Sequence, residues 1–86
     1  MYVVLVYDVD KKRVGKMLKL CRRYLHWIQN SVFEGEISAV KLKELVHSAN
    51  VIMEEEDSLI VFKSRDNKWL EKEVYGRERN RIENIL

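Results

Sequence analysis

A carboxylate at the end of an apolar run is the side chain in this sequence that is best placed for chemistry. The stretch YVVLVY at residues 2–7 has no charged break, and Asp8 follows it directly. Mg²⁺ (or Mn²⁺) prefers such oxygen ligands, and a strand end would hold the carboxylate rigidly. Two Asp8 side chains facing each other across a dimer axis would supply two ligands, and the ion could polarise a phosphate and activate water. We therefore predict Asp8 as a catalytic and metal-binding residue; the simpler alternative is an acid that only closes a turn or caps the helix.

A row of cations follows Asp8 and indicates a negatively charged partner. Lys11, Lys12 and Arg13 come first, and Lys16 and Lys19 continue the row. The helix macrodipole favours acidic side chains in a first turn, so local stability does not account for these cations. Such a ridge would bind nucleic-acid phosphates in a salt-dependent and largely sequence-independent way. We predict these five residues as nucleic-acid contacts; the alternative is a solvated helix face.

The residues around these side chains predict the elements that position them. Residues 2–7 are typical of a strand buried on both faces, and Asp10 is a suitable N-cap for a helix after it. In the segment that follows, apolar side chains recur at helical spacing and predict the buried stripe of that helix: Val14, Met17, Leu18, Cys21, Tyr24 and Leu25.

The rest of the chain completes a familiar order of elements. HWIQNSVFEGEI suits a tight hairpin that turns near residues 29–31, and Ser38 caps a second helix. EEED at 54–57 indicates a solvated acidic turn, and SLIVFK at 58–63 indicates another strand. Residues 69–75 alternate like a last, half-exposed strand. The order strand–helix–strand–strand–helix–strand, with one further strand, predicts an α+β, ferredoxin-like fold: an antiparallel sheet with both helices on one face.

Length and composition limit the classes of protein. Eighty-six residues make one small domain, which we place at residues 1–76, with a tail at 77–86. So short a chain has a thin core, which favours a homodimer. With 35% charged residues and no apolar stretch of about 20 residues, the sequence predicts no membrane association, and Cys21 as the single cysteine fits the cytoplasm. Basic residues gather at the start, because residues 1–33 hold seven lysines and arginines against two aspartates.

Three stretches resemble one known family. VVLVYDVD, KKRVGKMLK and above all WIQNSVFEGEIS closely resemble the Cas-two family of CRISPR-associated proteins, and the resemblance runs from Tyr2 to about Tyr75. It implies a homodimer of ferredoxin-like subunits that works in spacer acquisition, where it bridges dimers of the Cas-one integrase and helps to hold DNA. It also implies metal-dependent cleavage of RNA or DNA, with Asp8 as the catalytic and metal-binding aspartate.

The resemblance implies supporting roles as well. Tyr7 matches the aromatic neighbour of the aspartate, Phe33 matches the aromatic of the SVF motif, and Arg13 matches a basic position early in the helix. Trp27 departs from the pattern, because many relatives have arginine there; its ring could stack on a base or simply pack.

Three functions stay open on the sequence. The first is an adaptation protein with Mg²⁺-dependent endonuclease activity. The second is a DNA-binding scaffold that bridges the integrase without catalysis. The third is an unrelated ferredoxin-like RNA-binding module, although the sequence lacks the aromatic-rich strand with which RNA-recognition domains stack bases.

Overall fold

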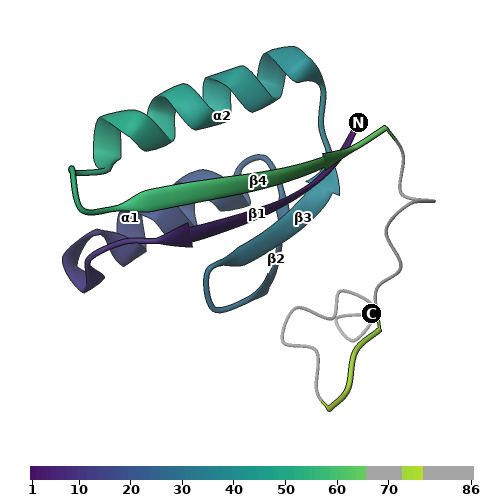
Figure 1. Ribbon diagram of the computed structural model, residues 1–86, viewed down its shortest axis with the longest axis horizontal. Helices are drawn as coiled ribbons and strands as arrows, with labels where there is room; N and C mark the ends of the chain where they lie inside the picture. The colour runs from purple at the N-terminus through teal and green to yellow at the C-terminus, as the bar shows by residue number, and fades with distance from the viewer. Residues whose placement is uncertain (66–72, 77–86) are drawn as a thin grey trace.

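The protein consists of a four-stranded antiparallel sheet with two helices packed on one of its faces (Figure 1). The computed structural model describes residues 1–65 and 73–76. The strand order across the sheet is β2-β3-β1-β4. The elements follow one another along the chain as β1 (Tyr2–Asp8), α1 (Lys11–Arg22), β2 (His26–Gln29), β3 (Val32–Glu36), α2 (Ala39–Ile52) and β4 (Ser58–Ser64). This order confirms the predicted ferredoxin-like arrangement.

Side-chain caps start both helices where the sequence predicted. The Asp10 carboxylate accepts a hydrogen bond from the Lys12 backbone N–H (3.1 Å), and this bond satisfies one of the free donors in the first turn of α1. The Ser38 hydroxyl accepts from the Lys41 N–H at 3.1 Å and caps α2 in the same way. The N-cap that fixes the start of α1 therefore lies only two residues after Asp8.

The core lies between the helices and the inner face of the sheet. Alternate residues of β1, namely Val3, Leu5 and Tyr7, point into it and are almost fully buried. The stripe predicted for α1 is partly wrong, because Val14 is 39% exposed. The residues of α1 that face the core are Arg13, Met17, Leu20 and Cys21. The buried face of α1 is therefore rotated relative to the predicted stripe. Arg13 points inward in place of Val14, and a search for apolar side chains could not find it.

The outer face of the sheet carries an apolar patch on β1 and β4 that is open in the single chain. Val4 pairs with Phe62 and Val6 pairs with Ile60 between β1 and β4. Phe62 is 58% exposed and Ile60 is 52% exposed, while the two valines are half-buried. One set of alternate apolar residues in β1 thus packs against the helices. The other set belongs to a surface that no described helix covers.

The last predicted strand lies mostly outside the described residues. Of residues 69–75 the structure describes 73–75, which belong to none of the four strands. The domain boundary at residue 76 and the tail at 77–86 stay predictions. Within the described part of the chain, neither helix is long and apolar enough to cross a membrane.

Candidate nucleic-acid and metal site

Asp8 lies at the exposed end of β1, beside the turn between β2 and β3. Its backbone pairs with Ser58 of β4, and the preceding N–H of Tyr7 donates to the Ser31 carbonyl at 3.2 Å. The Tyr7–Ser31 bond joins the strand end to the turn, and the two enclose a hollow of about 270 Å³. The residues that line it are Tyr7, Asp8, Val9, Val14, Asn30 and Ser31. Asp8, Asn30 and Ser31, whose side chains carry a carboxylate, an amide and a hydroxyl, therefore line one hollow at the turn that the sequence predicted.

Trp27 stabilises the turn between β2 and β3 through a hydrogen bond. Asn30 adopts a left-handed backbone conformation (φ 45°), and its carbonyl accepts a hydrogen bond from the Trp27 indole N–H at 2.8 Å. The guanidinium of Arg22 lies 5.2 Å from the centre of the indole ring, within the range of a cation–π contact. Of the two roles left open for Trp27, packing is the one for which the structure shows contacts.

Tyr7 and Phe33 support the strand end from inside the core. Their rings are stacked, with centres 6.0 Å apart and an interplanar angle of 26°, and both side chains are buried. The Tyr7 hydroxyl has no hydrogen-bond partner among the described residues. Burial raises the pKa of this phenol, and the neighbouring Cys21 raises it further. The tyrosine is therefore a neutral packing group beneath Asp8.

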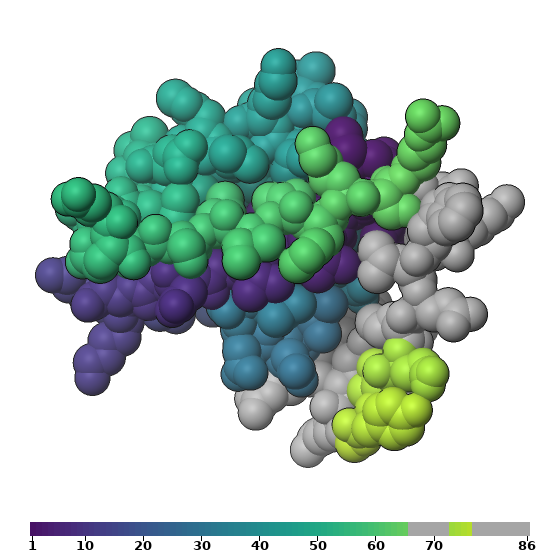
Figure 2. Space-filling model, in the orientation of Figure 1, coloured from purple at the N-terminus to yellow at the C-terminus, as the bar shows by residue number. Residues whose placement is uncertain are grey.

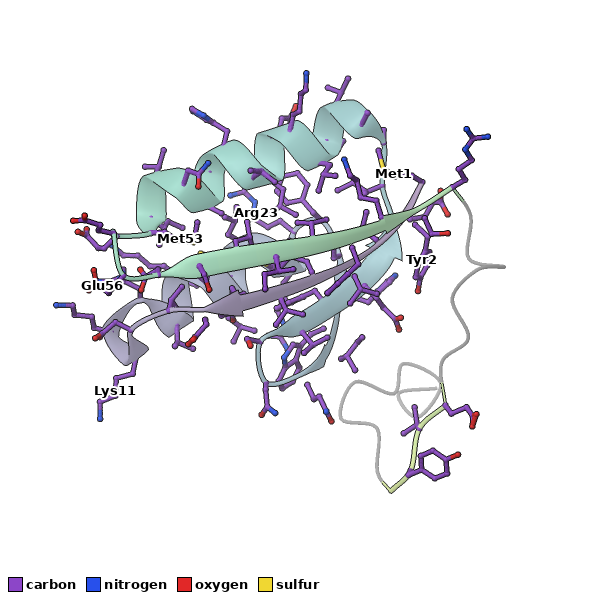
Figure 3. All side chains as sticks on the ribbon, in the orientation of Figure 1. Met1, Tyr2, Lys11, Arg23, Met53 and Glu56 are labelled. Carbon is purple, nitrogen blue, oxygen red and sulfur yellow. The ribbon has the colours of Figure 1, made fainter. Side chains whose placement is uncertain are left out.

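The lysines of the predicted ridge are exposed, but Arg13 is not among them. Lys11, Lys12, Lys16 and Lys19 all face solvent along α1, and Figure 3 shows Lys11 extending outward from its start. Within the described residues none of the four takes part in an ion pair. Their charge is therefore available to an external anion.

Arg13 corrects two expectations from the sequence. Its side chain is 11% exposed, and its Nε lies 2.6 Å from Oδ2 of Asp57. Glu56 adds a second contact, at 3.1 Å from Nη2. The acidic turn is consequently not wholly solvated, because the Asp57 side chain is only 1% exposed. These hydrogen bonds raise the pKa of Arg13 and hold the pKa of Asp57 well below its usual range, so both groups stay charged and mutually neutralised.

The single chain offers few metal ligands. No group of three or more His, Cys, Asp or Glu side chains gathers within the part of the molecule that the structure describes. Asp8 is the acidic residue that lines the hollow, and the other lining residues with a side-chain oxygen are Tyr7, Asn30 and Ser31. A complete Mg²⁺ shell needs oxygens from water, from a substrate phosphate or from a second chain.

An exposed strand-end carboxylate beside a row of exposed lysines, on a ferredoxin-like sheet, is an arrangement suited to a small nucleic-acid-binding domain. Comparison with known families makes the class specific, since the family described as CRISPR associated protein Cas2 matches residues 1–72. The chain belongs to this Cas2 family.

Relatives and solved structures agree with this assignment. The chain is 47% identical to the CRISPR-associated endoribonuclease Cas2 of Dictyoglomus turgidum over 87 residues, with all of both chains covered. It is 45% identical to the protein of the same name from Fusobacterium nucleatum, covering all of this chain and 87% of that one. A solved structure titled "Crystal structure of cas2" matches with a TM-score of 0.78 at 41% identity, covering 94% of this chain and 92% of the other. Streptococcus pyogenes Cas2 matches with a TM-score of 0.78 at 30% identity, covering 88% and 100%. The resemblance seen in the sequence is thereby confirmed.

Proposed function

We propose that this protein is a metal-dependent endoribonuclease of a CRISPR system, in which Asp8 from each subunit of a homodimer forms the catalytic centre. The observation that carries the proposal is the exposed Asp8 carboxylate at a hollow shared with Asn30 and Ser31. The relatives named endoribonuclease make RNA the first substrate to test.

The open face of the sheet supports the homodimer. Ile60 and Phe62 are more than half exposed, which is costly for large apolar side chains on a small protein. A second copy would cover them. The sheet also leaves β4 as an edge strand, to which residues 69–75 of the partner chain can add as a further strand.

The donor set at Asp8 fits Mg²⁺, or Mn²⁺ in its place. Mg²⁺ is usually held by one or two carboxylates, and keeps waters and substrate phosphate oxygens in its other positions. One Asp8 from each subunit meets that requirement. When bound, the ion supplies polarisation of the scissile phosphate and a more acidic water.

The chain's own residues hold the substrate. The exposed lysines of α1 attract the phosphate backbone, and the Ser31 hydroxyl and Asn30 amide can donate hydrogen bonds to a phosphate oxygen at the hollow. These contacts orient the phosphodiester, so that water adds to phosphorus while the bond to the leaving oxygen breaks. None of them reads a base, which predicts cleavage with little sequence preference.

A nuclease assay of the Asp8→Asn variant tests the catalytic role of Asp8. Wild type and variant are compared on single-stranded RNA and on duplex DNA, with Mg²⁺, with Mn²⁺ and with a chelator. We expect the variant to keep its fold and dimer but to lose metal-dependent cleavage, because the amide is isosteric and carries no charge. Asp10→Asn is the matched control: it removes a carboxylate two residues away and leaves a good N-cap. Wild-type rates in Asp8→Asn would refute the proposal.

RNA affinity at several salt concentrations tests the lysine row. Changing Lys12, Lys16 and Lys19 to Gln should weaken binding equally for unrelated sequences. It should also reduce the slope of log affinity against log salt by about 2, at about 0.7 per lost single-strand contact. Arg13 is left unchanged because its charge is already paired. The control carries the same change at three exposed lysines outside the row, Lys41, Lys43 and Lys63. An equal loss in both variants would show that the row is only a solvated face.

A second candidate is a DNA-binding scaffold in spacer acquisition that bridges Cas-one integrase dimers without catalysis. The sparse site favours it, since Asp8 stands as the single carboxylate of the hollow. The cleavage assay separates the two functions. A wild type that binds DNA and the integrase but cuts neither RNA nor DNA under any metal condition would support the scaffold.

A further inference from the structure

The carboxylate of Asp57 is a buried junction between three segments. Its Oδ1 accepts hydrogen bonds from the backbone N–H of Asp10 and from Nη2 of Arg13, both at 3.0 Å. Its Oδ2 accepts from the backbone N–H of Glu54 at 2.8 Å and from Nε of Arg13 at 2.6 Å. Four donors fill the four lone-pair positions of one carboxylate. Asp57 therefore links its own turn, the first turn of α1 and the loop that follows β1.

This junction lies directly beside the candidate catalytic aspartate. Asp10, which Asp57 holds through its N–H, is two residues after Asp8. Ser58, which follows Asp57, is the backbone partner of Asp8 in the β1–β4 ladder. Asp8 is consequently fixed through the sheet on one side and through the Asp57 carboxylate on the other. Figure 2 shows the start of α1 packed against the turn between α2 and β4, and in Figure 3 Lys11 and Glu56 mark this end of the molecule.

Holding α1 against the acidic turn would need fewer hydrogen bonds than the four that Asp57 accepts. The Arg13–Glu56 contact alone already ties α1 to the acidic turn, and Glu56 is 66% exposed. Asp57 differs from Glu56 because its side chain is buried and because it accepts a hydrogen bond from the backbone N–H of Asp10, in the loop between β1 and α1. A carboxylate that accepts backbone N–H bonds on both sides of a junction fixes where the loop runs, as well as holding the helix in place.

We propose that Asp57, held in place by Arg13, is a positioning residue that sets the location of Asp8 at the end of β1. Asp57 touches neither substrate nor metal; it acts through the Asp10 N–H and the β1–α1 loop. The inference rests on the proposed function for its catalytic consequence. For its structural consequence it rests only on the hydrogen bonds.

Asp57→Asn is the test variant, because an amide has the same shape but turns a donor group toward one side of the junction. Its matched control is Glu56→Gln, the same chemical change one residue away, on a side chain that does not contact the loop. Leu45→Val, a change at a fully buried position of α2, provides a second control that loses stability without touching the junction.

The first readout is steady-state RNA cleavage at a temperature where every variant is folded. We expect Asp57→Asn to lower kcat by about tenfold or more, since a misplacement of ~1 Å can cost up to about a hundredfold. We expect KM to stay near the wild-type value, because the lysine row is intact. Glu56→Gln and Leu45→Val should keep the wild-type kcat. If Asp57→Asn keeps the wild-type kcat too, or if Leu45→Val loses as much, Asp57 contributes only stability and the proposal is wrong.

The second readout is backbone hydrogen exchange, which needs no activity. In Asp57→Asn we expect faster exchange through the loop, at Asp8 and Val9 as well as at Asp10, with Leu5 in the middle of β1 unchanged. A change confined to the Asp10 amide would show a local cap and would overturn the inference. Should wild type fail to cleave RNA, the proposed function falls, while the exchange rates still decide whether Asp57 holds the strand end.

Discussion

Replacing Tyr7 by phenylalanine is expected to stabilise the protein, although a buried residue next to the candidate catalytic aspartate is changed. The Tyr7 hydroxyl is buried with no partner among the described residues, and a buried, unsatisfied polar group costs about 1–3 kcal/mol. Phenylalanine keeps the ring and its stacking on Phe33, and it leaves a space of only one oxygen atom. We therefore expect a gain of about 1 kcal/mol, at the low end of that range, which corresponds to about 4–8 °C in Tm for a domain of this size.

Urea unfolding at fixed protein concentration, together with a thermal melt, measures the gain. Tyr24→Phe is the control, since the Tyr24 hydroxyl donates an exposed hydrogen bond to Oε1 of Glu44 at 3.4 Å, and its loss should change stability by less than about 0.5 kcal/mol. RNA cleavage should be unchanged in Tyr7→Phe. A loss of stability in Tyr7→Phe would refute the reasoning, because it would mean that the hydroxyl has a partner in solution, such as a buried water.

The remaining predictions concern the thiol, the acidic junction and the C-terminal segment. Burial raises the pKa of Cys21 to about 12, so an alkylating reagent at about pH 8 should label it only when the chain unfolds. The stability that this neutral thiol contributes should be complete below its ordinary pKa and should fall as the pH rises toward 12. The pKa of Asp57 is lowered by its hydrogen bonds to Arg13, so its contribution should be present above the ordinary carboxyl range and be lost in acid. The stability difference between wild type and Asp57→Asn, measured in urea, should therefore narrow below about pH 4. Deleting residues 69–86 should give monomer or aggregate in sedimentation, and a well-folded dimer would contradict the added-strand hypothesis.

The order and type of the elements followed from local signals that sequence displays directly. The helix caps are examples, because Asp10 and Ser38 act on backbone donors within three residues of themselves. The place of Asp8 also followed from a local rule, since it is the first charged residue after a strand. The hairpin turn was found in the same way, at the residues that later proved to line the hollow with Asp8.

Side-chain contacts between residues far apart in the sequence could not be predicted from such local signals. Arg13 looked like one more cation in a basic helix, and Asp57 looked like the last acid of a solvated turn. Their 44-residue separation hides the contact between them. The same pairing explains why Val14 was wrongly placed in the core, because a charged residue that turns inward rotates the helix away from its apolar stripe. An inward-facing charge can be recognised only when its partner is known.

The indole of Trp27 gives the protein a built-in optical reporter. The chain has two tryptophans, at positions 27 and 69, so Trp69→Phe leaves Trp27 as the single indole emitter. That emitter is bonded through its N–H to the carbonyl of Asn30, a residue of the hollow, and has a guanidinium beside its ring. Indole emission responds to both contacts, so its wavelength and intensity follow the β2–β3 turn directly. Movements of the turn during metal or RNA binding can then be timed in a stopped-flow instrument without an added dye.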